Sequence, residues 1–166
     1  MSTLIGKTAL VTGGSRGIGR SIALALAEAG AQVVLTYHTQ RHAAEDVVAA
    51  IEQAGGQAWA IRLALQEDDS LLQAVRWTVA GHDAVDILVN NAAMAQERPF
   101  MLLTPDDWAT MLRVNLQGPF RLCQAVIPHM QRCGWGRIVN MVSIGGQIGG
   151  TNQVQYAASK AGLESL

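Results

Sequence analysis

The amino-acid sequence predicts an α/β protein built on a doubly wound parallel sheet, and two observations support this prediction. Short apolar runs rich in β-branched residues alternate with longer amphipathic segments along the whole chain. This alternation is typical of β-α-β units, in which a helix connects each strand to the next parallel strand. The short runs are also nearly all apolar, as expected for strands that helices cover on both faces.

Three strand–helix pairs are expected in the first half of the chain. The strands are predicted at residues 7–12, 32–37 and 57–63, and the helices at residues 17–29, 40–54 and 68–81. The first helix stops at Gly30 and the second at Gly55-Gly56, because glycine readily adopts the turn that ends a helix. The third helix starts with acidic residues, which the positive end of the helix dipole stabilises.

The second half continues the alternation with longer helical segments. It contains predicted strands at residues 85–89 and 136–142, a glycine-rich loop at 143–152, and a helix from about residue 153 to the end. No Gly, Asn or Pro stop follows this last helix, so we expect the chain to be truncated at its C-terminus.

The segment at residues 104–132 is predicted to be helical. Thr104 is a good N-cap, and Pro105 suits the first helical position because its missing N–H would have no partner there. Gly118-Pro119 interrupts the segment, so we expect either two helices or one sharp kink.

Length and composition limit the class of protein. A chain of 166 residues suggests one domain, residues 1–166, and 49% hydrophobic against 15% charged residues indicates a folded globular chain. Twelve Lys and Arg against 13 Asp and Glu provide no basic surface for nucleic acid or an anionic membrane. Neither a transmembrane run nor a signal peptide is recognisable, so we expect a cytoplasmic protein.

Cysteines and histidines show no pattern of a disulfide framework or a metal site. Cys123 and Cys133 are too few for either and are expected to be free thiols. The histidines are scattered over different predicted elements, without ligand spacing: His38, His42, His82 and His129. We therefore expect no metal cofactor.

The first predicted strand leads into a glycine-rich turn, residues 12–19 (TGGSRGIG), at the start of a helix. Glycines allow a tight turn and a close approach of the backbone to a pyrophosphate, which the N–H groups and dipole of the helix attract. An ordinary strand–helix turn also uses glycine. Gly13, Gly17 and Gly19, all placed at the first strand–helix turn, favour a nucleotide site.

Tyr156 and Lys160 are four residues apart and therefore lie on one face of the last predicted helix. An ammonium group close to a phenol favours the phenolate, and such a tyrosine can exchange a proton with an alcohol oxygen. The same spacing also occurs on surface helices. Ser143, however, follows the fifth predicted strand, at the sheet edge where parallel-sheet enzymes bind ligands. Its hydroxyl can donate a hydrogen bond to a carbonyl oxygen.

Taken together, these motifs resemble the short-chain dehydrogenase/reductase family. The motifs are T-G-x-x-x-G-I-G at 12–19, N-N-A-A at 90–93 in place of the usual N-N-A-G, Asn115, and Ser143 followed by Tyr156-x-x-x-Lys160. They occur in the family's order and extend over nearly the whole chain. The resemblance implies a Rossmann-like, three-layer αβα fold whose C-terminal strands are missing here.

The resemblance also implies a role for each catalytic residue. Tyr156 would be the general acid or base, Lys160 would tune it, and Ser143 would orient the substrate carbonyl. Asn115 would complete a tetrad by holding a water molecule that links Lys160 to solvent. An asparagine within a predicted helix is intrinsically unfavourable, which is consistent with a functional role.

The family uses a nicotinamide dinucleotide, and the charges here favour NADP(H) over NAD. A carboxylate at the end of the second strand would bind the ribose 2′-hydroxyl of NAD, but this strand ends in Tyr37-His38. Arg16 and Arg41 are candidates to bind the 2′-phosphate of NADP, because Arg pairs well with phosphate. Arg41 is equally consistent with a solvated charge at the start of a helix.

The family's remaining cofactor contacts are expected near the ends of the third and fourth strands. Leu65 takes the place of an Asp that often contacts adenine, so only its backbone can make that contact. Asn91 and Ala92 would lie against the ribose, and Ala93 would place a methyl group near the cofactor. The expected cofactor-binding residues are Gly13, Ser15, Arg16, Gly17, Ile18, Gly19, Tyr37, His38, Leu65, Asn91, Ala92 and Ala93.

The resemblance therefore implies an NADP(H)-dependent oxidoreductase acting on a carbonyl or secondary alcohol. The sequence is similar to 3-oxoacyl-carrier-protein reductases, so the substrate is either a free small molecule or one bound to a carrier protein. The full-length protein is expected to be a homo-oligomer. Two alternatives remain open: a truncated nucleotide-binding fragment without activity, and a non-enzymatic interaction module.

Overall fold

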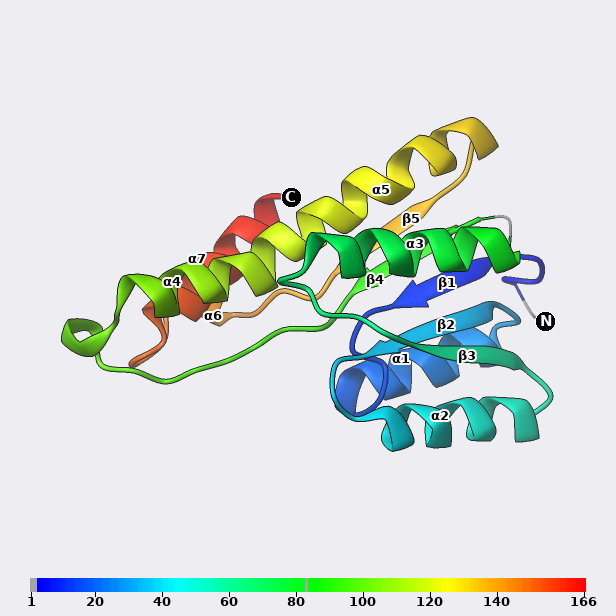
Figure 1. The fold of residues 1–166 in the computed structure, drawn as a ribbon, viewed down its shortest axis with the longest axis horizontal. Coiled ribbons are helices and arrows are strands. Elements are labelled where there is room, and N and C mark those ends of the chain that lie inside the picture. Colours follow the sequence, from blue (N-terminus) through cyan, green and yellow to red (C-terminus); the bar gives the residue numbers. More distant parts are fainter. Residues whose placement is uncertain (1–2, 83) are drawn as a thin grey trace.

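The computed structural model describes residues 3–82 and 84–166 and contains a parallel sheet with the strand order β3-β2-β1-β4-β5 (Figure 1). The strands are β1 (Thr8–Val11), β2 (Gln32–Tyr37), β3 (Gln57–Arg62), β4 (Ile87–Asn90) and β5 (Arg137–Asn140). The chain first proceeds outward from β1 to β3, then crosses to the other side of β1. The order of the strands therefore reverses between β1 and β4, which confirms the predicted doubly wound sheet.

Helices form a layer on each face of this sheet. On one face lie α1 (Gly17–Glu28) and α2 (Arg41–Gln53), and on the other lie α3 (Asp68–His82) and α5 (Gly118–Cys133) (Figure 1). The three-layer αβα arrangement that the resemblance implied is thus present. None of the helices in the described part of the chain is long and apolar enough to cross a membrane.

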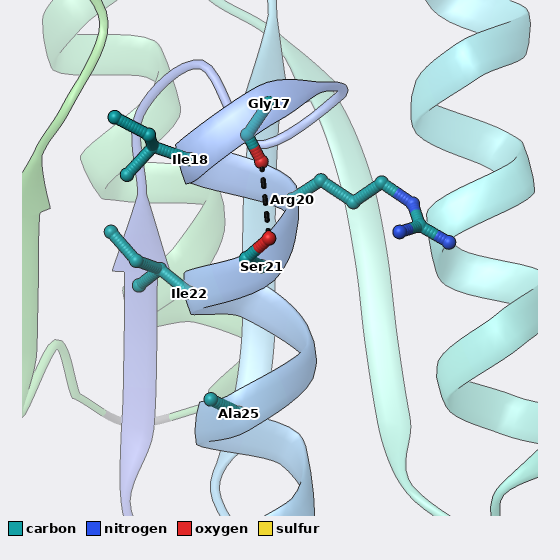
Figure 2. A pocket seen from close by; sticks show the side chains of 6 residues that line it. All are labelled: Gly17, Ile18, Arg20, Ser21, Ile22 and Ala25. Carbon is teal, nitrogen blue, oxygen red and sulfur yellow. Dashed lines mark hydrogen bonds between the residues drawn. The ribbon is translucent and has the colours of Figure 1, made fainter.

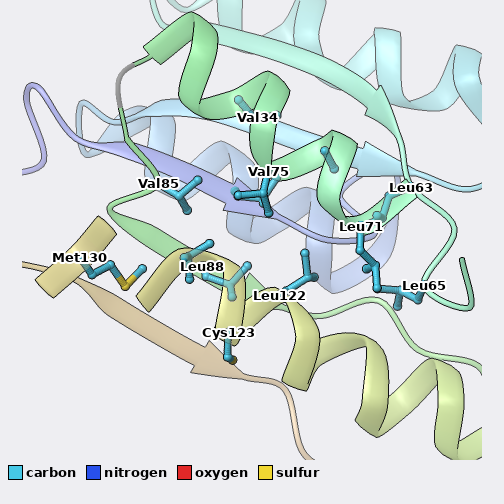
Figure 3. Close-up of a cluster of buried hydrophobic side chains, with 13 residues drawn as sticks. Val34, Leu63, Leu65, Leu71, Val75, Val85, Leu88, Leu122, Cys123 and Met130 are labelled. Atoms are coloured by element: carbon cyan, nitrogen blue, oxygen red, sulfur yellow. The ribbon is translucent and has the colours of Figure 1, made fainter. Parts of the chain in front are cut away.

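Each layer has its own hydrophobic core, because successive side chains of a strand point to opposite faces of the sheet. Leu10 of β1 and Leu88 of β4 pack with α3 and α5, in the core that Figure 3 shows. Ala9 and Val11 belong to the core beneath α1 and α2. The two cores hold β1 and β4 between them, and this fixes the strand ends that carry the site.

The predicted helix at 104–132 consists of three parts. It begins with α4 (Pro105–Leu112), continues through a π-helical turn, η2 (Arg113–Gln117), and ends as α5. The predicted N-cap is present, since Thr104 Oγ1 accepts a hydrogen bond from the Asp107 amide at 3.1 Å. The break predicted at Gly118-Pro119 takes the form of the π-helical turn directly before these residues. Pro119 has no N–H, so it cannot donate an α-helical hydrogen bond to the Asn115 carbonyl.

Two other predicted segments differ from the structure. The strand predicted at 85–89 lies at Ile87–Asn90, and the loop predicted at 143–152 contains a short helix, α6 (Gly145–Ile148). The last helix is α7 (Val154–Ser165), which contacts α4, α6 and η2. Together, α4, α6 and α7 lie beyond the carboxyl ends of β4 and β5 (Figure 1).

Candidate active site

The glycine-rich turn lies between β1 and α1, at the edge of the sheet where the strand order reverses. Gly13 has a φ of +66°, in the left-handed region that favours glycine. A Cβ atom on Gly19 would lie 2.2 Å from the Gly13 carbonyl oxygen and 2.5 Å from Asn91 Nδ2. Glycine is therefore required at both positions, by conformation at Gly13 and by close approach at Gly19.

Asn91 and Thr12 hold this turn against the end of β4. The Asn91 side-chain amide donates hydrogen bonds to the carbonyl oxygens of Thr12 (2.9 Å) and Gly13 (3.2 Å). Thr12 Oγ1 accepts from the backbone amides of Asn91 and Ala92, each at 3.0 Å. Gly13 N donates to Thr36 Oγ1 of β2 at 3.1 Å. The turn is thereby fixed to the two strands that flank β1.

The N-terminus of α1 is available to bind an anion. Arg16 is its N-cap, makes no side-chain hydrogen bond to the helix, and no acidic side chain lies in the first turn. The first N–H groups of a helix lack intrahelical partners and carry partial positive charge. This helix end therefore suits a phosphate group.

A cavity of about 730 Å³ opens in front of this helix end. All twelve residues that the sequence predicted for cofactor binding line it. Other lining residues were not predicted from the sequence: Thr36, Thr39, Gln40, Leu63, Gln66, Met94, Thr110 and Val114. Thr39 and Gln40 could have been predicted from the sequence, because they directly follow Tyr37-His38 at the end of β2, the strand that leads into the cavity.

Arg16 and His38 are the side chains among the lining residues that can carry positive charge, and no lining residue is a carboxylate. Arg41, the other candidate for a phosphate contact, does not line the cavity. Its Nε lies 2.7 Å from Glu45 Oε1, and this hydrogen bond raises the pKa of the Arg41 guanidinium. The structure thus favours the solvated helix-start interpretation of Arg41.

A second hollow, of about 690 Å³, lies on the outer face of α1 (Figure 2). Figure 2 shows Ile18 and Ile22 projecting to one side of the helix and Arg20 to the other. Ser21 Oγ donates within the helix to the Gly17 carbonyl, at 3.4 Å. This hollow is wide and mostly apolar, and the polar groups needed to orient a ligand lie in the first cavity instead.

Lys160 is a buried cation next to Tyr156 on α7. Only 3% of Lys160 is exposed, its Nζ donates to the Met141 carbonyl at 2.6 Å, and Nζ lies 5.9 Å from the centre of the Tyr156 ring. Burial lowers the pKa of the Lys160 ammonium. The pair on one helix face that the sequence predicted is therefore present, held by the chain that follows β5.

Ser143 lies two residues after Met141, whose carbonyl oxygen binds Lys160. Its Oγ accepts a hydrogen bond from the Gly145 amide at 3.1 Å, which orients the side chain at the start of α6. Asn140 of β5 pairs in register with Asn90 of β4. Ser143 thus follows the same edge of the sheet from which Asn91 and Ala92 line the cavity.

Asn115 is fully buried in the π-helical turn and connects the cavity wall to α7. Its Oδ1 accepts from the Met94 amide and its Nδ2 donates to the Met94 carbonyl, both at 2.9 Å. Nδ2 also lies 3.1 Å from Ser159 Oγ. Met94 lines the cavity and Ser159 precedes Lys160, so this side chain joins the two parts of the site.

The side-chain amide of Asn115 is thus occupied by protein partners. A water contact from this residue, as the resemblance implied, would have to use its backbone carbonyl. Pro119 leaves that carbonyl without an α-helical donor, because proline has no N–H. Within residues 3–82 and 84–166, no group of three or more His, Cys, Asp or Glu side chains could hold a metal ion.

A doubly wound sheet with a glycine turn and an anion-binding helix end at its switch point defines a nucleotide-binding α/β protein. The family model described as short chain dehydrogenase matches residues 7–166, so the chain belongs to this family.

Known relatives agree with this assignment. The chain is 40% identical over 160 residues to the 3-oxoacyl-[acyl-carrier-protein] reductase FabG of Staphylococcus epidermidis, in a match that covers 96% of the chain and 66% of the relative. The 3-oxoacyl-[acyl-carrier-protein] reductase of a Synechocystis strain is 38% identical over 163 residues, 98% of the chain and 66% of the relative. The chain thus spans just under two thirds of the length of these relatives.

Solved structures also resemble it. A metagenomic short-chain oxidoreductase in complex with NADP superposes with a TM-score of 0.94 at 36% identity, covering 99% of this chain and 74% of that one. A dehydrogenase/reductase from Sinorhizobium meliloti has a TM-score of 0.89 at 39% identity, covering 98% and 64%.

Proposed function

We propose that the protein is an NADP(H)-dependent oxidoreductase that transfers a hydride between the nicotinamide and a carbonyl compound or secondary alcohol. The observation that carries this proposal is the buried Lys160 ammonium beside Tyr156, at the sheet edge that bears Ser143 and the cavity. A family relationship alone would not require these groups to be retained together. Their chemistry is that of proton transfer to an oxygen atom.

The residues present fit a dinucleotide with a 2′-phosphate. The N-terminus of α1 and the glycine turn would hold the pyrophosphate, and Arg16 would pair with the 2′-phosphate. The absence of a carboxylate among the lining residues supports NADP(H) over NAD, and a solved relative is described in complex with NADP. When bound, the nicotinamide supplies or takes the hydride.

The chain's own residues provide the acid–base chemistry. Tyr156 donates its hydroxyl proton to the substrate oxygen during reduction and takes it back during oxidation. The Lys160 ammonium stabilises the phenolate that remains, and the Ser143 hydroxyl donates a hydrogen bond that orients the same oxygen. Asn115 keeps Met94 and Ser159 in place, and its backbone carbonyl would hold the water that returns a proton to Lys160.

The relatives suggest the substrate class. Because several are named 3-oxoacyl-[acyl-carrier-protein] reductases, we propose a 3-oxoacyl thioester carried on acyl carrier protein. We also propose a homo-oligomer. An apolar groove between α4, η2, α5 and the end of α7, whose lining includes Leu112, Leu116, Phe120 and Leu166, supports a contact between copies.

A specific observation supports an alternative, in which this chain binds the nucleotide without turning over substrate. Apolar side chains on and after β5 are exposed: Val139 (44%), Val142 (43%), Ile144 (67%) and Ile148 (79%). These residues flank Ser143, so the substrate side of the site is open to water. An open site weakens the electrostatic stabilisation of a developing charge.

The experiment that tests the proposal measures NADPH oxidation by the purified chain with a 3-oxoacyl thioester. A saturated acyl thioester of equal length, which has no ketone to reduce, is the matched control. We expect NADPH consumption with the 3-oxo compound and none with the saturated control. Saturable NADPH binding without consumption would support the binding-only alternative, and failure to bind NADPH would overturn the proposal.

A further inference from the structure

A second buried amide side chain, besides Asn115, lies next to the proposed catalytic residues. Gln155 belongs to the first turn of α7 and directly precedes Tyr156. It is fully buried, with 0% of its surface exposed, and it does not line the nucleotide cavity. Its Nε2 donates a hydrogen bond to the Gln96 carbonyl at 3.0 Å. Gln155 therefore joins the turn that carries Tyr156 to a segment 59 residues earlier in the chain.

The Gln96 carbonyl belongs to the segment at residues 91–98, which follows β4 and begins in the wall of the cavity. Asn115 binds the amide and the carbonyl of Met94, which lines the cavity. Further along, the Arg98 amide donates to the Asn152 carbonyl at 2.8 Å. The segment is thus held at residues 94, 96 and 98, and Gln155 supplies the middle contact.

Another side-chain contact between this segment and the start of α7 lies at the surface. Gln153 Nε2 donates to Glu97 Oε1 at 3.2 Å, in a pair that is exposed to water. A hydrogen bond in a buried, low-dielectric environment is electrostatically stronger than one in water. The hydrogen bond from the buried Gln155 amide is therefore better suited to fix the distance between α7 and the segment.

The other polar atom of the Gln155 amide is unpaired. Gln155 Oε1 is buried and has no hydrogen-bond partner among the residues that the structure describes. An unpaired buried oxygen costs free energy, and an apolar side chain of the same length would avoid that cost. Stability alone therefore does not account for a glutamine at this position, whereas the use of its N–H donor on the Gln96 carbonyl does.

We propose that Gln155 is a positioning residue, which sets the distance between the Tyr156 hydroxyl and the nucleotide cavity by binding the Gln96 carbonyl. This inference rests on the proposed function. Because Gln155 is buried outside the cavity, it acts through Tyr156 and not on the substrate. Reacting atoms must approach to about 3–3.5 Å, and a displacement of about 1 Å can lower the rate about 100-fold. Loss of the Gln155 contact should therefore slow the reaction without weakening NADPH binding.

The test compares the wild type with Gln155→Met, which keeps the length of the side chain and removes both polar atoms. The matched control is Gln124→Met, at an exposed position of α5. NADPH bound to excess protein is mixed with a saturating 3-oxoacyl thioester, and the single turnover is followed by NADPH absorbance. The amplitude counts the folded sites, and the rate constant reports the chemical step. NADPH affinity is measured separately by protein fluorescence.

We expect the single-turnover rate constant of Gln155→Met to fall by about 10- to 100-fold. The amplitude should be unchanged, and the dissociation constant of NADPH should stay within about twofold of the wild type. A role in the stability of the fold alone would lower the amplitude and leave the rate constant unchanged. Gln124→Met should match the wild type in all three measurements.

The remaining outcomes separate this inference from the proposed function. A wild-type rate constant in Gln155→Met, or a loss of NADPH affinity as large as the loss of rate, would overturn the role of Gln155 and leave the proposed function standing. If Gln155→Met does not fold, Gln155→Asn decides by the same criteria, because it keeps the amide on a side chain one methylene shorter. No NADPH consumption by the wild type would overturn both.

Discussion

The proposed cofactor region (the glycine turn at 12–19 with the ends of β2 and β4) and the proposed catalytic region (Asn115, Ser143, Tyr156 and Lys160) are built in different ways. In the cofactor region, close backbone approach and the side chains of Thr12, Thr36 and Asn91 fix the glycine turn at the ends of strands β1 and β4, which are fully buried. In the catalytic region, β5 is partly exposed, and buried polar side chains from helices hold the geometry. Both regions use long-range hydrogen bonds, and the first depends in addition on close backbone approach.

This difference has a consequence for how each region responds to mutation. The glycine turn fails when a side chain is added, because a Cβ atom on Gly19 meets backbone atoms. The catalytic region fails when a polar side chain is removed, since Asn115 and Lys160 each satisfy a distant backbone carbonyl. The two regions can therefore be tested separately.

The largest expected effect is a loss of turnover that leaves NADPH binding unchanged. Tyr156→Phe removes the hydroxyl and retains the ring, so NADPH oxidation should fall by about 10²–10⁴-fold, the usual contribution of general acid–base catalysis. Tyr156 does not line the nucleotide cavity, so NADPH affinity should stay within about twofold of the wild type. An equal loss of affinity and turnover would argue against an acid–base role.

A smaller effect is expected where the two regions are joined. Asn115→Ala leaves the Met94 amide and carbonyl and Ser159 without their buried partner, which should lower the free energy of unfolding by about 2–4 kcal/mol. Gln117→Ala, at an exposed position of the same turn, is the control and should change it by less than about 0.5 kcal/mol. Urea unfolding measures both. Equal stability of the two variants would show that Asn115 does not join the regions.

The smallest expected effect is a pH dependence that originates at Lys160. Burial lowers the pKa of its ammonium below the usual 10.5, so the fold binds this proton less well than the unfolded chain does. The resulting cost is fully present below the folded pKa and disappears as the pH rises towards 10.5.

Lys160→Met removes this titration and keeps a long side chain. The wild type should therefore gain stability relative to Lys160→Met as the pH rises towards 10.5, as measured by urea unfolding. A difference between the two proteins that stays constant with pH would mean that Lys160 binds its proton equally well in both states.

Much of the cofactor region could be predicted from sequence because its determinants are local. Each determinant lies within one short stretch of the chain. The glycine turn occupies residues 12–19, and most of the other expected cofactor residues lie at or directly after the end of β2 or β4. Consecutive residues at strand ends reach the same edge of a parallel sheet. Arg41 was the ambiguous case, and Glu45 four residues later is the local signal that explains its position.

The catalytic region was only partly predictable, because its geometry depends on contacts between distant residues. The spacing of Tyr156 and Lys160 indicated a shared helix face, but not that Lys160 binds the Met141 carbonyl. Gly118-Pro119 indicated a break in the helix, but not that the π-helical turn would bury Asn115 against Met94. Such contacts arise from packing between helices, which residue spacing does not specify.

We propose that the glycine turn at residues 12–19 and the ends of β2 and β4 together bind the dinucleotide. The most direct test is a fluorescence titration with NADPH of the wild type, Gly19→Ala and Gly81→Ala. Gly81 lies in α3, and a methyl group added there would meet no atom within 4 Å, so its substitution should be harmless. We expect saturable binding to the wild type and to Gly81→Ala, and an affinity at least about 100-fold weaker for Gly19→Ala. Absence of wild-type binding, or equal binding to Gly19→Ala, would contradict it.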